Sequence, residues 1–207
     1  MQTEESRTLE KILEAAKEEF LEKGFQKASL RSIVKIAGVT TGAFYRYYSS
    51  KEALFAALVE PHAAAVMGKF MQTMDEFEEL PGEQQTVQMG NASGDCIAWI
   101  LDYVYEHYDE FRLLICCADG TPYENFVHNM VEVEVESTYK YLEVLRAMGH
   151  RVSDIDKQLC HMVASGMFSG MFEMIVHNMS KEDAVRCVGQ LRQFYTAGWE
   201  KLMGVKF

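Results

Sequence analysis

The fold is decided between Ile33 and Leu54, where the chain reads IVKIAGVTTGAFYRYYSSKEAL. Just before this stretch, Ser29 is placed as the N-cap of a short apolar helix. This helix should stop at Gly38, because glycine tolerates left-handed dihedral angles, and Thr40 then caps the next helix. A helix, a three-residue turn and a second helix form the helix-turn-helix motif, which reads the major groove of DNA.

The same stretch closely resembles the signature of the TetR family of bacterial transcriptional regulators, in which IA-x-x-AGVS-x-GTLY-x-YF-x-SKE-x-L is usual. The match spans roughly the first 60 residues. Two positions depart from the pattern: Val34 replaces the usual alanine, and Ala43 replaces a hydroxyl residue, a change that could alter base preference. The resemblance implies an all-helical fold of nine helices, dimerisation through the last two helices and the sensing of a small molecule.

The remaining sequence also favours helix, because Ala, Leu, Met, Glu, Lys and Gln dominate it and only three prolines interrupt it. We therefore expect an all-α fold of about nine helices, with an N-terminal three-helix head and a C-terminal helical bundle. The expected helix-turn-helix DNA-binding domain spans 1–52. The expected ligand-binding and dimerisation domain spans 53–207.

The first helix is expected at 8–23, with Gly24 as its stop and Glu19 among the glutamates of its polar face. A long helix should begin after Ser50, which caps it, and should kink at Pro61 before ending near residue 79. Further helices are expected at 95–108, 109–118, 121–148, 153–178 and 180–203.

Two segments are harder to assign. The segment 80–94 contains several glycines and a Pro-Gly pair, so we expect a polar, mobile loop there. The run Val131 to Glu136 alternates with period two, which by itself favours a strand. Since apolar residues from Phe126 to Leu145 continue a helical face through this run, we expect it to be helical.

Charge is unevenly distributed along the chain. The formal net charge of −11 argues at first against nucleic acid as a partner. The part from Gly24 to Lys51, however, has no Asp or Glu and five cations, so its formal charge is +5. This pattern suits a basic head drawn towards phosphate and an acidic body kept away from it. The five cations are Lys27, Arg31, Lys35, Arg46 and Lys51.

The second helix of the motif should present its N-terminal residues to base edges. Arg46 carries a long donor fork for a bidentate contact with guanine, and Arg31 is the second candidate. Gly42 would let the backbone approach DNA closely, and by the family resemblance Tyr47 and Lys51 touch phosphate. The expected DNA-binding residues are Ser29, Arg31, Thr40, Thr41, Gly42, Ala43, Tyr45, Arg46, Tyr47 and Lys51.

For the other aromatic and basic side chains of the head, we also consider core packing and nonspecific charge effects. Phe44 is expected in the core of the head rather than on DNA. For Tyr45 and Tyr48, core packing and DNA contact both stay open. Lys27 and Lys35 are expected to be solvated or loosely attracted to phosphate.

The expected body is rich in aromatic and methionine side chains, which suit a pocket for a partly apolar ligand. The same side chains could equally build an ordinary helical core. No metal or other cofactor is expected, since the histidines and cysteines lack H-E-x-x-H or C-x-x-C spacing and the adjacent Cys116 and Cys117 make a poor redox pair. The expected pocket residues are Trp99, Tyr103, His107, Phe111, Phe126, Met130, Tyr139, Met167, Phe168 and Met171.

Small residues between 164 and 170 would allow another helix to approach closely, and the final helix offers an apolar face. By the resemblance, these helices form a four-helix interface with a second copy; alternatively, they bury these faces only against their own body. The expected interface residues are Gly166, Ser169, Gly170, Leu191, Tyr195 and Trp199.

These features predict a cytoplasmic repressor that binds a palindromic operator as a homodimer and is released when a small molecule shifts the long helix behind the head. A polar, acidic N-terminus and interrupted apolar stretches predict no membrane association. An enzyme is not expected, because a nucleophile elbow, a phosphate loop and a metal signature are all missing from the sequence. Two alternatives stay open: an adaptor or sensor of this fold without DNA binding, and an activator of transcription.

Overall fold

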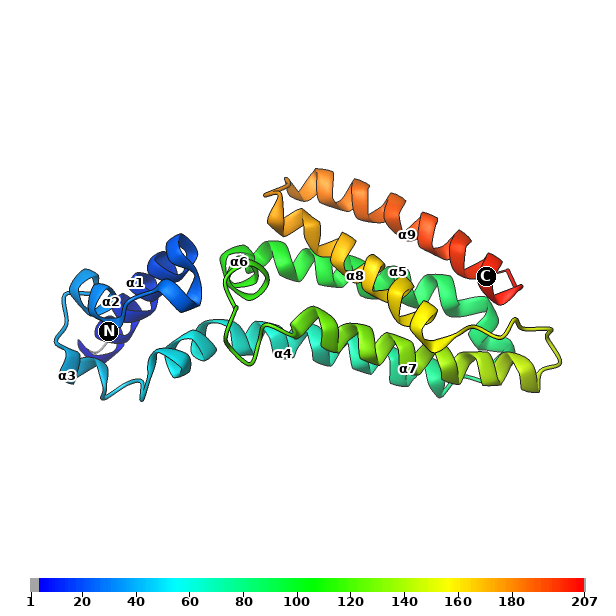
Figure 1. Ribbon diagram of the computed structural model, residues 1–207, viewed down its shortest axis with the longest axis horizontal. Helices are drawn as coiled ribbons and strands as arrows, with labels where there is room; N and C mark the ends of the chain where they lie inside the picture. Colours follow the sequence, from blue (N-terminus) through cyan, green and yellow to red (C-terminus); the bar gives the residue numbers. More distant parts are fainter. Residues whose placement is uncertain (1–3, 207) are drawn as a thin grey trace. The chain divides into compact units, whose positions relative to one another are not determined.

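The computed structural model describes residues 4–206, and within them the chain forms nine helices and no strand. This confirms the expected all-α fold. Figure 1 shows α8 and α9 lying side by side, as their contacts also require. The helices are α1 (Glu4–Lys27), α2 (Leu30–Ile36), α3 (Thr41–Phe44), α4 (Lys51–Glu78), α5 (Gly82–Glu106), α6 (Tyr108–Cys116), α7 (Phe126–Ala147), α8 (Lys157–Val176) and α9 (Lys181–Met203).

The chain divides into two compact units. Unit 1 contains the residues up to Ala64 and His107–Phe126, so it holds α1–α3, the start of α4 and all of α6. Its core contains the rings of Phe20, Phe25 and Phe55, with centroids 5.1 Å apart for Phe20–Phe55 and 5.3 Å for Phe25–Phe55. Packing therefore extends the head-bearing unit beyond the boundary expected at residue 52. The functional division at that boundary stays a prediction.

The α6 helix belongs to unit 1 through direct contacts with α1. The Phe25 amide donates to the Cys117 carbonyl oxygen at 3.0 Å, and Lys17 forms an ion pair with Glu110. A segment distant in sequence thus completes the packing of the head's first helix.

Unit 2 comprises Ala65–Glu106 and the chain from Val127 onward, with the rest of α4 and α5, α7, α8 and α9. Edge-to-face packing of Phe70 on Phe168, with centroids 5.4 Å apart, joins α4 to α8. Phe77 packs near Tyr141 of α7 at 5.6 Å. Both α4 and α8 are apolar and long enough to cross a membrane by composition alone, a property that core helices of soluble proteins share.

The loop expected at 80–94 is wrong, because α5 begins at Gly82. The side chain of Gln85 is buried and donates to the carbonyl oxygens of Glu78 and Leu80, at 3.2 and 2.9 Å, which satisfies the end of α4. A Cβ at Gly94 would lie 2.9 Å from Nη1 of Arg192, so this glycine allows α9 to pack closely. Tertiary contacts thus outweigh the low helix propensity of glycine.

Two other expectations concern helix continuity. The helix α4 continues through Pro61, and the kink expected at this residue stays a prediction. The alternating run from Val131 to Glu136 lies inside α7, which confirms that it is helical.

Candidate nucleic-acid interface and ligand cavity

The caps expected in the head are confirmed, and they set the geometry of the helix-turn-helix. Ser29 Oγ accepts the Ser32 amide at 3.4 Å at the start of α2, and Thr40 Oγ1 accepts the Ala43 amide at 3.1 Å at the start of α3. Between these helices, Gly38 has a φ of +68°, a conformation that glycine adopts without strain. The turn therefore places α3 immediately after α2.

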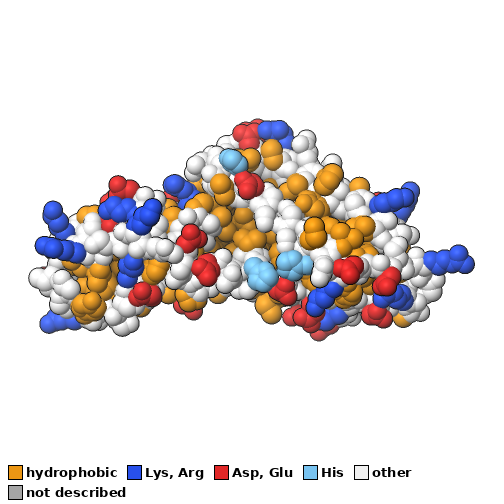
Figure 2. All heavy atoms as spheres, viewed as in Figure 1, with side chains coloured by type: hydrophobic (Ala, Val, Ile, Leu, Met, Phe, Trp, Pro, Cys, Tyr) orange, Lys and Arg blue, Asp and Glu red, His pale blue; other side chains and the backbone are white. Residues whose placement is uncertain are grey.

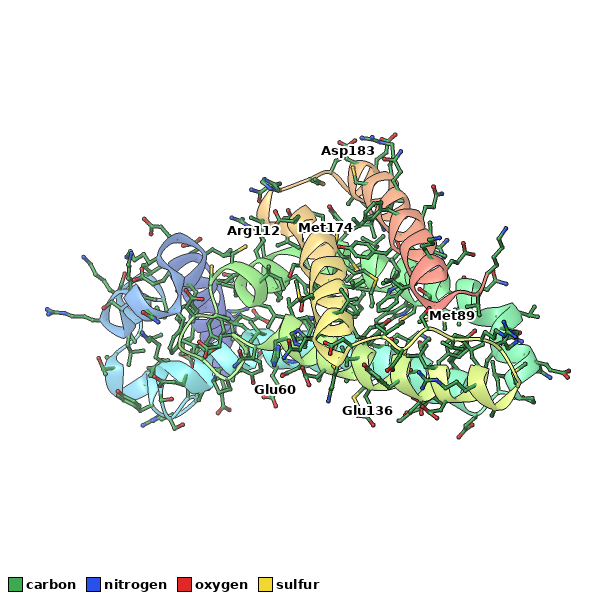
Figure 3. All side chains as sticks on the ribbon, turned by 45° about the vertical axis from the view of Figure 1, so that its right-hand side comes forward. Glu60, Met89, Arg112, Glu136, Met174 and Asp183 are labelled. Atoms are coloured by element: carbon green, nitrogen blue, oxygen red, sulfur yellow. The ribbon has the colours of Figure 1, made fainter. Side chains whose placement is uncertain are left out.

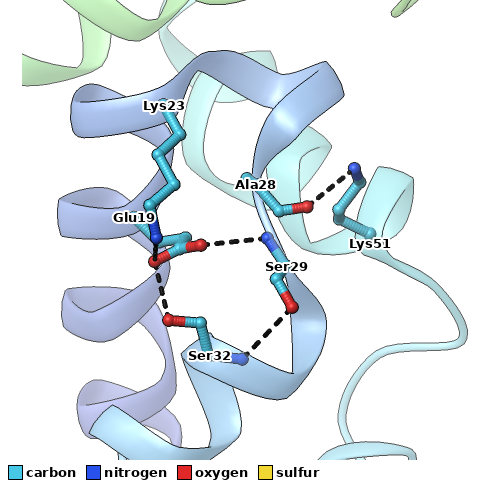
Figure 4. A network of polar contacts seen from close by, with 6 residues as sticks. All are labelled: Glu19, Lys23, Ala28, Ser29, Ser32 and Lys51. Carbon is cyan, nitrogen blue, oxygen red and sulfur yellow. Dashed lines mark hydrogen bonds and ion pairs between the residues drawn. The ribbon is translucent and has the colours of Figure 1, made fainter.

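A buried carboxylate that the sequence analysis placed on the polar face holds α2 against α1. Glu19 is 1% exposed and accepts hydrogen bonds from the Ser29 amide at 3.0 Å, from Ser32 Oγ at 2.8 Å and from Lys23 Nζ at 2.8 Å (Figure 4). Burial alone would raise the pKa of Glu19, but these hydrogen bonds outweigh it and the pKa lies below its usual range. The expectation that Glu19 faces solvent is wrong.

The exposed surface of the head carries most of the residues expected to meet DNA. Arg31, Thr41, Gly42 and Arg46 are exposed, as are Ser29 and Thr40. Figure 2 shows many Lys and Arg side chains over the N-terminal helices. This arrangement leaves a donor-rich face available to an anionic partner.

The aromatic residues of the head differ in how deeply they are buried. Phe44 is fully buried, as expected, with the ring of Tyr48 6.0 Å from its own. Tyr48 is half-buried, and burial raises its pKa. Tyr45 is 54% exposed, which favours surface contact over core packing for this residue. The hydroxyl of half-buried Tyr47 donates to the Glu5 carbonyl oxygen at 3.5 Å.

Lys51, expected on phosphate, is engaged inside the head. Its Nζ donates to the carbonyl oxygens of Phe25 and Ala28, at 2.7 and 3.1 Å, and lies 3.4 Å from that of Gln26 (Figure 4 draws the bond to Ala28). It also lies 4.4 Å from the centroid of the Phe25 ring. These contacts use the three donors of the ammonium group, so half-buried Lys51 caps the end of α1. The phosphate contact expected of it stays a prediction.

A mostly apolar cavity of about 120 Å³ lies in unit 2 between α4, α5, α7, α8 and α9. In Figure 3, Met89, which lines this cavity, lies beside the C-terminal part of α9. Three of the ten expected pocket residues line it: Met167, Phe168 and Met171. The N-terminal part of α5, expected to be a loop, supplies several further lining residues, which explains why sequence reasoning missed them. These are Met89, Gly90, Ala92 and Ser93.

The other seven expected pocket residues lie elsewhere. His107 and Phe111 belong to unit 1, and Phe126 is the last residue of that unit. Trp99 is 36% exposed and stacks on Tyr103 with centroids 5.0 Å apart. Met130 is buried in the core, and the hydroxyl of Tyr139 donates to the Ile155 carbonyl oxygen at 2.6 Å. Helical periodicity identified these side chains as apolar but could not say which of them border a void.

Most residues expected at the dimer interface meet one another within a single chain. A Cβ at Gly166 would lie 2.6 Å from the Tyr195 hydroxyl, and one at Gly170 would lie 3.2 Å from Leu191 Cδ2. Leu191, Tyr195 and Trp199 line the cavity, and Trp199 is only 8% exposed. These small residues therefore allow α8 and α9 of the same chain to pack closely. Ser169 is exposed.

Two groups of side chains have the donor types and the proximity that a transition metal requires, although no metal was expected. His62, His107 and Glu110 form one group, in which Glu110 is paired with Lys17. His128, Glu132 and His161 form the other, with His161 Nε2 3.1 Å from Glu132 Oε1. The five cysteines of the chain are free thiols, three of them buried. Vicinal Cys116 and Cys117 are not joined.

Comparison with known proteins relates this site to a family. Residues 12–58 match the family model for bacterial regulatory proteins of the tetR family. The chain is 57% identical over 51 residues to the uncharacterized HTH-type transcriptional regulator YvdT of Bacillus subtilis strain 168, covering 25% of this chain and 26% of YvdT. It is 36% identical over 75 residues to the HTH-type transcriptional regulator UidR of Escherichia coli strain K12, covering 36% and 38%. The matches span well under half the length of these relatives.

A solved structure extends the likeness to the whole fold. The Bacillus subtilis transcriptional regulator FadR in complex with stearoyl-CoA aligns with a TM-score of 0.54 at 17% identity, covering 92% of this chain and 98% of that one. At this identity, the likeness concerns the arrangement of the helices alone.

Proposed function

We propose that the protein is a cytoplasmic transcriptional repressor, because residues 12–58 match the family model for bacterial regulatory proteins of the tetR family. In this proposal a homodimer binds a palindromic operator, and a small molecule releases it. The observation that carries the proposal is the head. It presents exposed Arg31, Thr41 and Arg46 around the turn at Gly38, in a segment without acidic residues. This is the chemistry with which a helix-turn-helix contacts base edges and phosphates.

The test is a titration of the full-length protein with duplexes from the DNA upstream of its gene. If each head neutralises about three phosphates, the affinity of the dimer should fall with salt at a log–log slope of about −5. A scrambled duplex should bind more weakly at every salt concentration. A slope near zero, or no binding to any upstream duplex, would contradict the proposal and favour the adaptor that keeps this fold without contacting DNA.

The proposed dimer uses the outer faces of α8 and α9. On α8, exposed apolar or small residues recur at spacings of three and four: Leu159, Met162, Gly166 and Ser169. Met162 is 69% exposed and Phe194 of α9 is 71% exposed. A seam with this spacing is typical of helix–helix interfaces, and large exposed apolar side chains favour a partner. The proposed interface therefore moves from the cavity-lining residues of α9 to its exposed face.

The proposed ligand site is the apolar cavity of unit 2, which is bounded by side chains from five helices. Such cavities suit a small, mostly apolar molecule. The complex of the similarly folded FadR with stearoyl-CoA supports a ligand-binding role for this bundle. Transcript yield in a reconstituted transcription reaction distinguishes repression from activation. The protein without ligand should lower the yield, and the ligand should restore it.

A further inference from the structure

The mostly apolar cavity of unit 2 is lined by one carboxyl group. Its other polar lining residues include Ser93, Ser137, Thr138, Thr196 and Arg192. Glu134, on the inner side of α7, lines this cavity. Its side chain is half-buried, and it lies on the wall of this cavity. Among residues 4–206, no hydrogen bond or ion pair reaches its carboxylate. Burial alone raises the pKa of Glu134 to about 7.

The groups facing Glu134 do not supply a counter-charge. Arg192 also lines the cavity, but its Nη1 donates to the Gly90 carbonyl oxygen at 2.9 Å, and within residues 4–206 no ion pair joins it to Glu134. The α4 side of the cavity is formed by Phe70, Met74 and Phe77, which do not ionise. The remaining ionisable groups around the cavity are Cys96 of α5, Tyr141 of α7, Cys160 of α8 and Tyr195 of α9.

Three of these groups stay neutral at physiological pH. Burial raises the pKa of Cys96 above its usual value, that of Cys160 to about 11 and that of Tyr141 to about 12. A carboxyl group without a counter-ion in such a place is costly to ionise unless a cation enters with a ligand.

The rest of the wall also suits a cation. Six aromatic side chains line the cavity, and the faces of such rings attract positive charge, most strongly where water is excluded. The volume of about 120 Å³ is of the order of a dry protein cavity of about 150 Å³ that binds benzene, so the ligand should be compact. The six rings are those of Phe70, Phe77, Tyr141, Phe168, Tyr195 and Trp199.

We propose that the cavity binds a compact apolar cation, a molecule that carries an amine or quaternary ammonium group against the carboxylate of Glu134 and its apolar part against the aromatic wall. The proposal rests on the function proposed above, because it names the chemical class of the regulator's ligand. An anionic ligand would instead have to use Arg192 and would leave Glu134 beside its own negative charge.

Binding should depend on pH in a defined direction. The cation pairs with the ionised carboxylate, whereas free Glu134 is protonated below about pH 7. As pH falls below this value, affinity should therefore drop about tenfold per unit, because a proton must be released for each cation bound. Above about pH 8, affinity should level off. A quaternary ammonium probe does not titrate itself, so the dependence reports on the protein.

The experiment is isothermal titration calorimetry of the full chain, without DNA, at several pH values. The probes are benzyltrimethylammonium, its uncharged isostere neopentylbenzene, and the anion 3-phenylpropionate. We expect the cation to bind at least about tenfold more tightly than the isostere at pH 8. Glu134→Gln should abolish this preference and the pH dependence while it still binds the isostere, which also shows that the variant is folded. Glu136→Gln is the matched control on the same helix, since Glu136 points outward from α7 (Figure 3).

Three outcomes would overturn the proposal. If the isostere binds as tightly as the cation, Glu134 does not select charge, and the cavity remains a ligand site of another class. If 3-phenylpropionate binds best, Arg192 is the polar anchor. If no probe binds, the cavity holds no ligand of this size, and the ligand-sensing part of the proposed function fails as well. Operator binding by the head is measured separately, so this outcome does not contradict it.

Discussion

At the scale of single residues, the head separates side chains that hold its helices together from side chains that it presents. Glu19 and Lys51 both use their charges on groups within the head, one on the start of α2 and the other on the end of α1. Arg31 and Arg46 are exposed, so their guanidinium groups are available to a partner outside the chain. Substitutions in the two groups should therefore have different signatures.

We expect Glu19→Gln to lower the free energy of unfolding by about 1–3 kcal/mol, because buried partners of a charged acceptor are left poorly satisfied. Its folded-state pKa is depressed, so the stabilisation is present above about pH 4.5 and is lost as pH falls further. Urea denaturation between pH 3 and 8 measures both effects. The exposed neighbour Glu18→Gln is the control and should behave like the unsubstituted protein. Equal pH profiles for Glu19→Gln and the unsubstituted protein would exclude this role.

We expect Arg46→Ala to lose about 1–3 kcal/mol of operator binding and to relax preference at one base pair per half-site, because a bidentate contact carries sequence information. Its melting temperature should not change, since Arg46 is exposed. Lys51→Ala should instead lower the melting temperature and weaken binding to operator and random duplex alike. Titrations of both duplexes, with melting curves for each variant, separate the two effects. Intact affinity and base preference in Arg46→Ala would move recognition to Thr41 and Tyr45.

At the scale of elements, α3 and α5 show what glycine does inside a helix. In α5, a Cβ at Gly94 would lie 2.9 Å from Nη1 of Arg192, so the end of this flexible side chain would have to shift. In α3, a Cβ at Gly42 would meet only Thr40 Oγ1, at 4.0 Å, so the isolated protein does not need glycine there. We therefore expect the reason for glycine at position 42 to lie in a contact that the backbone makes outside the chain.

Gly42→Ala should leave the protein folded and slightly more stable, by up to about 1 kcal/mol, because alanine favours helix. It should nevertheless weaken operator binding by about 1 kcal/mol or more, the value of one backbone contact to DNA. The matched control is Gly68→Ala on α4, where a Cβ also meets open space and DNA binding should stay unchanged. Melting curves and operator titrations provide the comparison. Undiminished binding by Gly42→Ala would show that the backbone at this position stays clear of DNA.

At the scale of the whole molecule, the proposed function requires two copies. We expect Met162→Glu combined with Phe194→Glu to convert dimers to monomers, because two charges would be buried without partners in the interface. Val87→Glu is the control, since Val87 is 77% exposed on α5, outside the proposed interface. Light scattering determines the mass of each variant, and monomers should also lose tight operator binding. A dimeric double variant would place the interface elsewhere.

The sequence by itself determined the helical class, the helix-turn-helix and its caps, because these depend on interactions between near neighbours. Ser29, Gly38, Thr40 and Phe44 act through bonds and dihedral angles that a short segment contains. Tertiary structure decided the rest. Glu19 is a buried acceptor because α2 packs on α1. The segment after Gly82 is held by tertiary contacts, since Gln85 within it donates to the Leu80 carbonyl oxygen and Arg192 of α9 donates to that of Gly90.

The same distinction applies to the cavity of unit 2. Periodicity identifies which side chains are apolar, but a cavity is a gap between helices and depends on how five of them pack. Sequence reasoning therefore expected Met167, Phe168 and Met171 in a pocket, and they line the cavity. Tyr195 and Trp199, expected at a dimer interface, line it too, and Glu134 had no expected role. The pKa of that carboxyl group is raised by its burial on the wall of a cavity, which only the folded chain creates.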